Sequence, residues 1–277
     1  MDAVLEEVRS RAEAARGEEG VYRDAAGRLR CAVCHEPREE EIPGIRGLCP
    51  VVCSCLRREE ERREMRSRAA EARRRAAASP FWSPGCEAMT FGLDDAPDSG
   101  ASLLCREYVR RWEDMQREDL GLIFSGPLGT GKSFYAAAIV NALLDRGVPA
   151  VMTAASRLVN LLRAAREPQA MLDELCAFPL VALDDLGAER DTDFAVEVLE
   201  SFVDLRAMSK KPLLVTTNLT GKQLRRPPDL RYGRIFDRVL ALCPCPVLLT
   251  GPSRRVSLGE QRRSRMEELL GKAERPG

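Results

Sequence analysis

Histidine, lysine and aromatic residues are scarce in this chain of 277 residues, and aromatic residues make up only 5% of it. His35 is the only histidine, which excludes any mechanism that needs two imidazole groups. Lysine accounts for five of the 43 lysine and arginine residues, so a lysine inside a motif is less easily explained by composition. The formal net charge is zero, and nucleic-acid binding would therefore have to come from local basic patches.

Long apolar runs are also missing from the sequence. None approaches the roughly 20 residues that a membrane-spanning helix needs. The first 16 residues mix acidic and basic side chains and lack the apolar stretch of a secretory signal, so we expect a cytoplasmic protein with no membrane partner. Ten cysteines in a chain of this kind argue against a disulfide framework.

Five of the ten cysteines lie within residues 31–55, a clustering that is typical of a metal site. Four thiolates suit tetrahedral Zn²⁺, and residues 18–55 hold too few large apolar side chains for a core without a metal. The expected zinc ligands form a C-x-x-C and a C-x-C pair: Cys31, Cys34, Cys53 and Cys55. Cys49 or His35 could replace one of them, and free, buried or redox-active thiols are the alternative.

The strongest motif is a G-x-x-x-x-G-K-S phosphate loop between a strand-like run and a helix-like run, which is the context that the motif requires. It consists of Gly126, Pro127, Leu128, Gly129, Thr130, Gly131, Lys132 and Ser133. The glycines let main-chain N–H groups surround the phosphates of ATP, and the helix N-terminus favours negative charge. Lys132 is expected to reach the β- and γ-phosphates, and Ser133 to bind Mg²⁺.

Two further strand-like runs end in polar residues. The run at 180–183 is continuously apolar, as in a buried parallel strand, and leads into Asp184 and Asp185. We assign Asp184 to Mg²⁺ and Asp185 to activation of the attacking water, with Glu189 as a second candidate for the water. A later run ends in Thr-Thr-Asn218, where the polar side chain could contact the γ-phosphate or the water, and a turn cap is the alternative.

Strand-like and helix-like runs alternate in the second half of the chain, which predicts an α/β fold with a parallel sheet flanked by helices. The expected strands are 121–124, 150–153, 180–183, 213–216 and 247–250. The expected helices are 132–146, 156–165, 194–207 and 232–242. The phosphate loop, the paired acids and Asn218 each lie at the carboxyl end of a strand, where phosphate sites occur in such sheets.

Four segments follow from the composition. They are an N-terminal helix with the zinc module (1–56), a charged linker helix (57–80), the ATPase domain (81–256) and a charged, partly helical tail (257–277). Residues 57–75 contain nine arginines and five glutamates, which gives a net charge of +4. A solvated linker is the favoured interpretation of this segment, and a basic strut that contacts nucleic acid or a partner is the alternative.

The motifs and their order resemble the DnaC/IstB group of AAA+ ATPases, which comprises bacterial and phage helicase loaders and transposition ATPases. The resemblance covers about residues 78–256 and depends on the phosphate loop followed by Leu-Asp-Asp-Leu-Gly-Ala-Glu, Val-Thr-Thr-Asn-Leu and Arg-Ile-Phe-Asp-Arg. The cysteine module followed by an Arg/Glu-rich helix resembles the N-terminal part of phage-type and DnaC- and DnaI-like loaders. The transposition helpers usually lack such cysteines.

The resemblance also implies residue roles. Asn218 matches the sensor-1 position, and Arg238 matches the arginine finger that enters the ATP site of a neighbouring subunit, with Arg234 one helical turn earlier as a competitor. Arg255 falls at the sensor-2 position, but Arg254 replaces the tyrosine of the family and leaves the register between the two arginines open. An arginine supplied by another subunit makes hydrolysis depend on assembly.

The expected function is therefore that of an ATPase that loads a replicative helicase, a DnaB-type hexamer, onto single-stranded DNA and assembles with itself through its ATP sites. Asp185 is shorter than the glutamate of fast AAA+ motors, so we expect a weak basal rate that suits a switch. Candidates for single-strand contact are Arg225, Arg226, Arg231 and the tail arginines. The alternatives are an IstB-like transposition helper that binds duplex DNA and a transposase, a P-loop small-molecule kinase, and a nucleotide-binding adaptor without hydrolysis.

Overall fold

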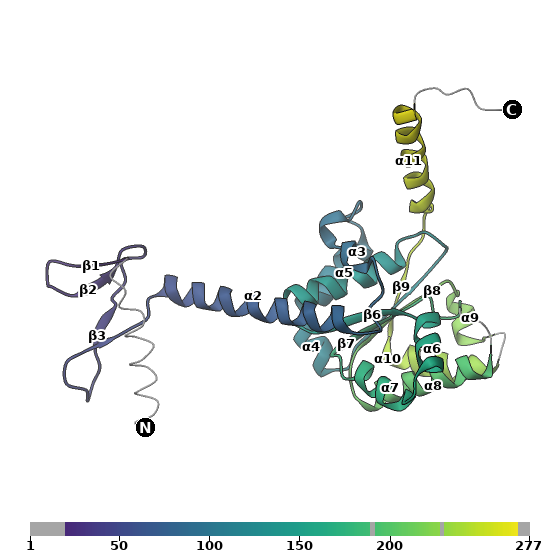
Figure 1. Cartoon of the computed structure of the whole chain (residues 1–277), viewed down its shortest axis with the longest axis horizontal. Coiled ribbons are helices and arrows are strands. Elements are labelled where there is room, and N and C mark those ends of the chain that lie inside the picture. Colours follow the sequence, from purple (N-terminus) through teal and green to yellow (C-terminus); the bar gives the residue numbers. More distant parts are fainter. Residues whose placement is uncertain (1–19, 189–191, 228–229, 271–277) are drawn as a thin grey trace. The chain divides into compact units, whose positions relative to one another are not determined.

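A computed structural model describes residues 20–188, 192–227 and 230–270 (Figure 1). The chain divides into two compact units, Met1–Ser67 and Arg68–Gly277. The expected N-terminal helix and Glu189 lie outside the described residues. Across the ranges that the structure describes, every helix is too short or too polar to cross a membrane.

The first unit is built from two short antiparallel hairpins. One pairs β1 (Val21–Arg23) with β2 (Leu29–Cys31), and the other pairs β3 (Glu39–Glu41) with β4 (Leu48–Pro50). Strands of three residues contribute little burial by themselves. Side-chain contacts and the cysteines therefore have to supply much of the order in this unit.

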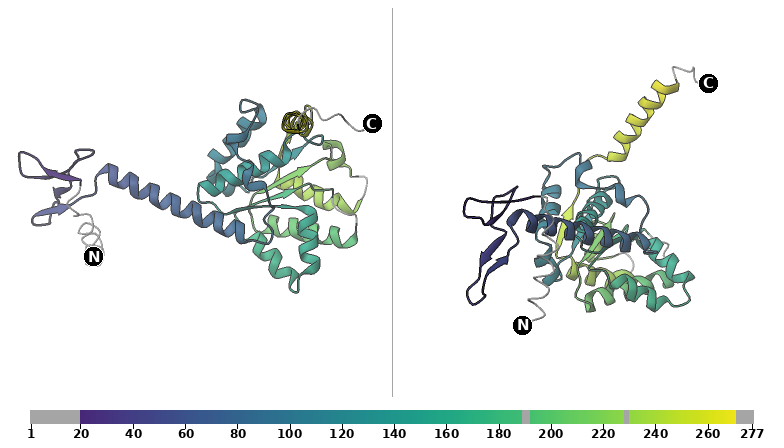
Figure 2. Two further views of the ribbon diagram at one scale, coloured as in Figure 1. Left: turned by 45° about the horizontal axis from the view of Figure 1, so that its top comes forward. Right: turned by 60° about the vertical axis from the view of Figure 1, so that its left-hand side comes forward.

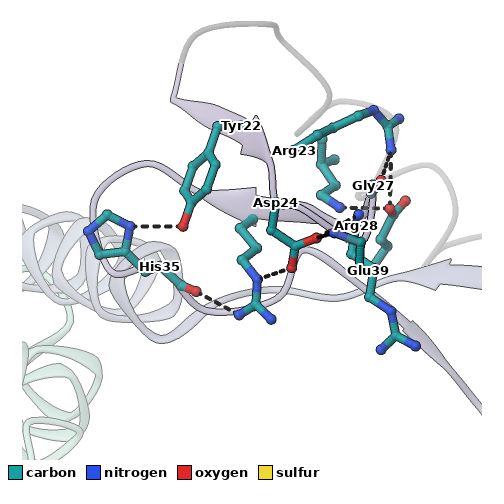
Figure 3. Close-up of polar contacts among 10 residues, drawn as sticks. Tyr22, Arg23, Asp24, Gly27, Arg28, His35 and Glu39 are labelled. Carbon is teal, nitrogen blue, oxygen red and sulfur yellow. Dashed lines mark hydrogen bonds and ion pairs between the residues drawn. The ribbon is translucent and has the colours of Figure 1, made fainter.

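Polar contacts hold the two hairpins together (Figure 3). Asp24 Oδ2 accepts from Arg30 Nε at 2.5 Å inside the first hairpin. Glu39 Oε1 accepts from the main-chain nitrogen of Leu29 at 2.7 Å, and this bond joins β3 of the second hairpin to β2 of the first. Glu39 thus joins the two hairpins, with the main-chain bond from Arg38 to Leu29, while Asp24 stabilises the first hairpin alone.

The charged segment forms the long helix α2 (Ser54–Ala78), which runs from the first unit into the second. In the second unit, Ala72 and Ala76 are buried, and Arg73 donates to Asp145 at 2.6 Å. The last turns of α2 therefore pack on the rest of the second unit through small residues. A hydropathy pattern does not single out such residues, because arginines and glutamates dominate the rest of the helix.

Five parallel strands form the sheet of the second unit, in the order β6-β7-β8-β5-β9. They are β5 (Leu122–Ser125), β6 (Ala150–Ala154), β7 (Leu180–Asp184), β8 (Leu213–Thr217) and β9 (Cys245–Leu248). The predicted parallel α/β fold is confirmed. Only the last strand begins clearly earlier than predicted, because Cys245 pairs with Leu122 at the sheet edge, where Pro246 is tolerated.

Helices cover both faces of this sheet (Figures 1 and 2). The helices that match predicted ones are α5 (Lys132–Asp145), α6 (Ala155–Ala164), α8 (Asp193–Met208) and α10 (Gly233–Leu242). The structure adds η1 (Cys86–Ala88), η2 (Phe91–Leu93), α3 (Gly100–Arg110), α4 (Trp112–Arg117), α7 (Pro168–Cys176), α9 (Gly221–Arg225) and η3 (Leu230–Tyr232). The start of the predicted tail forms α11 (Arg254–Leu270).

Alternating strand residues divide the apolar core into two layers. Phe124 and Leu214 face α3, α5 and the end of α2, whereas Ile123 and Val215 face α6, α7, α8 and α10. This division follows from the two-residue period of a strand. Because the sheet is buried on both faces, its carboxyl-end edge is left as the place where polar side chains can gather.

A buried arginine ties several of these elements together. Arg206 of α8 is fully buried, and its terminal nitrogens donate to the main-chain carbonyls of Cys176, Phe178, Pro179 and Pro212. Burial lowers the pKa of Arg206 to about 10. This pKa lies well above neutral pH, so the side chain stays charged, and the four carbonyls satisfy terminal N–H groups that would otherwise be unpaired.

We expect Arg206→Met to lower the free energy of unfolding of the second unit by about 3 kcal/mol, because buried carbonyls lose their donors. Both tryptophans, Trp82 and Trp112, belong to this unit, so guanidinium unfolding followed by tryptophan fluorescence reports on it alone. The matched control is Arg110→Met, which removes only an exposed pair with Glu107 and should leave the midpoint unchanged. An Arg206→Met chain as stable as the wild type would contradict this role of the guanidinium.

Candidate nucleotide and metal sites

The phosphate loop connects β5 to α5, and its main chain is left-handed at Gly126 (φ 143°), Gly129 (φ 80°) and Gly131 (φ 98°). Neighbouring atoms also leave no room for a side chain at two of these glycines. A Cβ atom at Gly126 would lie 2.0 Å from the carbonyl oxygen of Leu249, and one at Gly129 would lie 2.0 Å from Ser253 Oγ. Glycine is therefore required at the first two positions both by conformation and by the chain that follows β9.

Lys132 is held inside this loop. The residue is 5% exposed, and its Nζ donates to the carbonyls of Gly126 (2.8 Å) and Pro127 (2.7 Å). Burial lowers the pKa of Lys132, and the negative charges of Asp185 and Asp184 partly offset that effect. The ammonium group thus lies between the loop carbonyls and the two predicted acids.

A cavity of about 490 Å³ opens beside the loop and brings together most of the residues predicted to bind ATP. The predicted residues that line it are Leu128, Gly129, Gly131, Lys132, Ser133, Asp185, Asn218 and Arg255. Met89, Leu93, Asp95, Phe134 and Arg254 complete the lining. Gly126, Pro127 and Thr130 belong to the same loop but not to this lining, and Asp184, the predicted ligand of Mg²⁺, also lies outside it. One cavity therefore combines phosphate-binding, acidic and apolar surfaces.

The two acids lie where β7 ends. Asp184 is its last residue, and Asp185 follows in the left-handed conformation (φ 56°), which aspartate adopts more readily than most residues. Thr216 Oγ1 donates to Asp184 Oδ1 at 2.6 Å and accepts from the main-chain nitrogen of Asp185 at 2.9 Å. Burial raises the pKa of Asp185, the charge of Asp184 raises it further, and Lys132 and Arg255 oppose the change.

Two consecutive arginines reach the cavity from the chain after β9. Arg254 forms an ion pair with Asp95 at 2.7 Å and lies over the ring of Tyr135, while its main-chain nitrogen donates to the carbonyl of Gly129 at 2.9 Å. Arg255 is exposed, and its positive charge acts to lower the pKa values of the partly buried Asp185 and of Lys132. Both arginines thus line the cavity, and Asp95 engages Arg254.

The predicted finger arginines lie on α10, outside the cavity lining of their own chain. Arg238 forms an ion pair with Asp204 of α8 and lies 3.7 Å from Glu200. Arg234 lies 3.6 Å from Glu200, and its side chain is 81% exposed. Both arginines are therefore paired with acids of α8 in the single chain.

The predicted cysteine quartet forms one cluster in the first unit. The sulfur atoms of Cys31, Cys34, Cys53 and Cys55 all lie within 4.8 Å of one another. The main-chain N–H of Cys34 is the main cause that lowers the pKa of Cys31 to about 6, whereas contacts with the sulfur atoms of Cys53 and then Cys31 raise the pKa of Cys55 to about 12. This donor set is compatible with zinc, which would favour the thiolate form of all four.

The two alternative ligands have other neighbours. Cys49 lies in β4 opposite Glu40, outside the cluster. His35 Nδ1 lies 3.2 Å from the hydroxyl of Tyr22, and the two rings meet edge to face (Figure 3). The structure thus gathers the four cysteines that the spacing predicts and keeps both substitutes apart from them.

Thr216 and the segment 89–95 are the parts of the nucleotide site that the sequence analysis missed. Thr216 belongs to the run that ends in Asn218, and the pairing of Leu183 with Val215 places it beside Asp184. A hydroxyl and a carboxylate at the ends of neighbouring strands would have been the signal, but only once the strand order was known. Residues 89–95 contain a single 3-10 turn and show no periodicity that marks them as a cavity wall.

Comparisons with known proteins agree on one group of relatives, although no family model matches the chain. The replicative helicase loader DnaC of Escherichia coli (strain K12) is 26% identical over 159 residues, which cover 56% of this chain and 62% of that protein. The replicative helicase loader DnaI of Bacillus subtilis (strain 168) is 26% identical over 148 residues, which cover 49% and 47%. A crystal structure of DnaI matches with a TM-score of 0.53 and 26% identity, over 63% of this chain and 94% of that one.

Fold and site together define the second unit as a P-loop ATPase domain of the AAA+ class. The predicted resemblance is confirmed: this is a DnaC-type AAA+ domain whose homologues include the DnaC and DnaI helicase loaders. The chain spans less than two thirds of the length of the curated relatives it matches.

Proposed function

We propose that this chain is an ATP-switched AAA+ protein that loads a replicative DNA helicase onto single-stranded DNA. The observation that carries the proposal is the single cavity in which Lys132, Asp185, Asn218 and Arg255 meet, in a domain homologous to replicative helicase loaders. The same cavity would serve an IstB-like transposition helper, and the homology to the DnaC and DnaI loaders is what favours the loader over that alternative.

The residues of the cavity, together with Asp184 at the end of β7, each have a role in this proposal. The phosphate loop and Lys132 bind the triphosphate, while Ser133 and Asp184 bind Mg²⁺, which neutralises the phosphate charge. Asp185 orients the attacking water, and its raised pKa is consistent with a partly buried acid. The apolar side chains at the cavity wall, those of Met89, Leu93 and Phe134, supply a surface for the base.

The remaining segments supply the contacts with partners. We divide the chain into segments 1–56, 57–80, 81–256 and 257–277. The zinc module of the first segment and the start of α2 would contact the helicase. The exposed side chains of Arg225 and Arg226, at the end of α9, would contact the strand phosphates. Arg231 is engaged with Asp193 at 2.8 Å and therefore contributes less to such a patch.

Native mass spectrometry of the chain mixed with the replicative helicase of its host tests the proposal. A complex should form with ATP and dissociate with ADP, because the switch depends on the γ-phosphate. Lys132→Ala, which removes the ammonium group from the phosphate loop, should form no complex with either nucleotide. The absence of a complex with wild-type protein in both states would contradict the loader and favour a transposase with duplex DNA as the partners.

The cysteine quartet predicts about one zinc ion per chain, measured by elemental mass spectrometry of purified protein. Cys53→Ser removes one of four thiolates and should lose the metal, whereas Cys49→Ser leaves the quartet intact and should keep it. Tryptophan fluorescence, which reports only on the second unit, should show the same unfolding midpoint in both variants. Equal zinc content in the two variants would contradict the assigned ligand set.

The finger role of Arg238 predicts a defect that another chain can repair. With helicase and single-stranded DNA present, Arg238→Ala should lower hydrolysis by roughly 10³-fold, because the charge on the transferred γ-phosphate is no longer balanced. Mixing it with Asp185→Asn, which keeps the arginine and the phosphate loop but lacks the acid assigned to the water, should restore part of the rate if the arginine acts in a neighbouring site. Arg234→Ala is the matched control one turn earlier, and a larger loss there would move the role to Arg234.

A further inference from the structure

The acids at the end of β7 are connected to the next strand through a side chain. Thr216 is 1% exposed, and its hydroxyl contacts both residues, through the carboxylate of Asp184 and the main chain of Asp185. It donates to the carboxylate of Asp184 at 2.6 Å and accepts from the main-chain nitrogen of Asp185 at 2.9 Å. The carbonyl of Thr216 then accepts from the nitrogen of Leu186 at 2.9 Å.

The left-handed turn at Asp185 explains why a side chain is needed there. Main-chain pairing between β7 and β8 runs from Val181 to Leu183, and β7 ends at Asp184. Asp185 then turns out of the strand with φ 56°, so its N–H meets the hydroxyl of the neighbouring strand. A buried N–H group without a partner is costly, and the hydroxyl removes that cost.

The direction of both hydrogen bonds is fixed by chemistry. A main-chain nitrogen can only donate, so the Thr216 oxygen must accept from Asp185. Its single hydrogen is therefore free to point at Asp184, where Oδ1 accepts it. This leaves the second carboxylate oxygen of Asp184 for a metal ion or its water, and it restrains rotation of the carboxylate.

We propose that Thr216 is a positioning residue that fixes the orientation of both acids for Mg²⁺ and for the attacking water. The inference rests on the proposed ATPase activity. It adds a residue that touches neither nucleotide nor metal and acts through Asp184 and Asp185. Residues that orient metal ligands typically change metal affinity or activity by about 10–100-fold when they are removed.

The chain offers a matched control in the adjacent residue. Thr217 is also fully buried, but its hydroxyl donates to the carbonyl of Leu186 and accepts from the nitrogen of Leu219. Thr217→Val therefore removes a buried hydroxyl of the same strand without touching either acid. A general loss of packing or stability should appear in both threonine variants, whereas a positioning effect should appear only in Thr216→Val.

The test measures binding of a fluorescent ATP analogue in EDTA and in a Mg²⁺ titration, together with hydrolysis and the thermal unfolding midpoint. For Thr216→Val, we expect the half-saturating Mg²⁺ concentration to rise about 10-fold and kcat to fall about 10–100-fold. Affinity for the analogue in EDTA should stay at the wild-type value, because the phosphate loop is intact. Thr216→Ser keeps the hydroxyl and should restore the Mg²⁺ dependence, and Thr217→Val should leave it unchanged.

Three results would overturn the inference. They are an unchanged Mg²⁺ dependence in Thr216→Val, an equal change in Thr217→Val, and a parallel loss of binding in EDTA. The helicase is absent from this assay, so a wild-type chain that hydrolyses ATP but forms no helicase complex would contradict only the loader function. A wild-type chain that shows no Mg²⁺-dependent binding would contradict the ATPase function and this positioning role together.

Discussion

The close approach of the phosphate loop to the chain after β9 is the constraint on which the nucleotide site depends. At Gly126 and Gly129 the loop main chain contacts Leu249 and Ser253 at distances that no Cβ atom permits. Because β5 lies between β8 and β9 in the sheet, the loop stands between the acids on one side and the two arginines on the other. The order of the strands, rather than any single motif, therefore brings Asp185 and the two arginines to the same phosphate loop.

The sequence was sufficient for the parts of the site that are contiguous in the chain. The phosphate loop and the paired acids can each be found by spacing alone, because one turn or one strand end fixes their geometry. The two cysteine pairs can also be found by spacing, but only the fold brings them together and leaves Cys49 and His35 outside the cluster. Contacts between distant segments could not be found in this way. The bond from Thr216 to Asp184 requires β7 and β8 to be neighbours, and the pairing of Arg254 with Asp95 joins residues about 160 positions apart in the chain.

Arginine and lysine perform different tasks in this structure, which gives physical meaning to the unusual composition. Arg206 is buried because a planar guanidinium can donate to several carbonyls at once, and Arg254 combines an ion pair with a contact on an aromatic face. Lys132 lies where a compact charge on a flexible stem is required, and it folds onto the loop carbonyls. A chain that otherwise prefers arginine thus keeps lysine at the position where the fork of a guanidinium would fit poorly.

Under the proposed function, the ion pair of Arg238 with Asp204 also affects the ATP-dependent assembly of neighbouring chains. For Arg238 to enter the ATP site of a neighbouring chain, it has to leave the acids of α8, and that loss opposes assembly. A bound nucleotide can offset this cost only through interactions that differ between the separate and assembled states. The γ-phosphate supplies the additional negative charge that distinguishes ATP from ADP, so ATP favours the assembled state, and its hydrolysis returns Arg238 to its own chain.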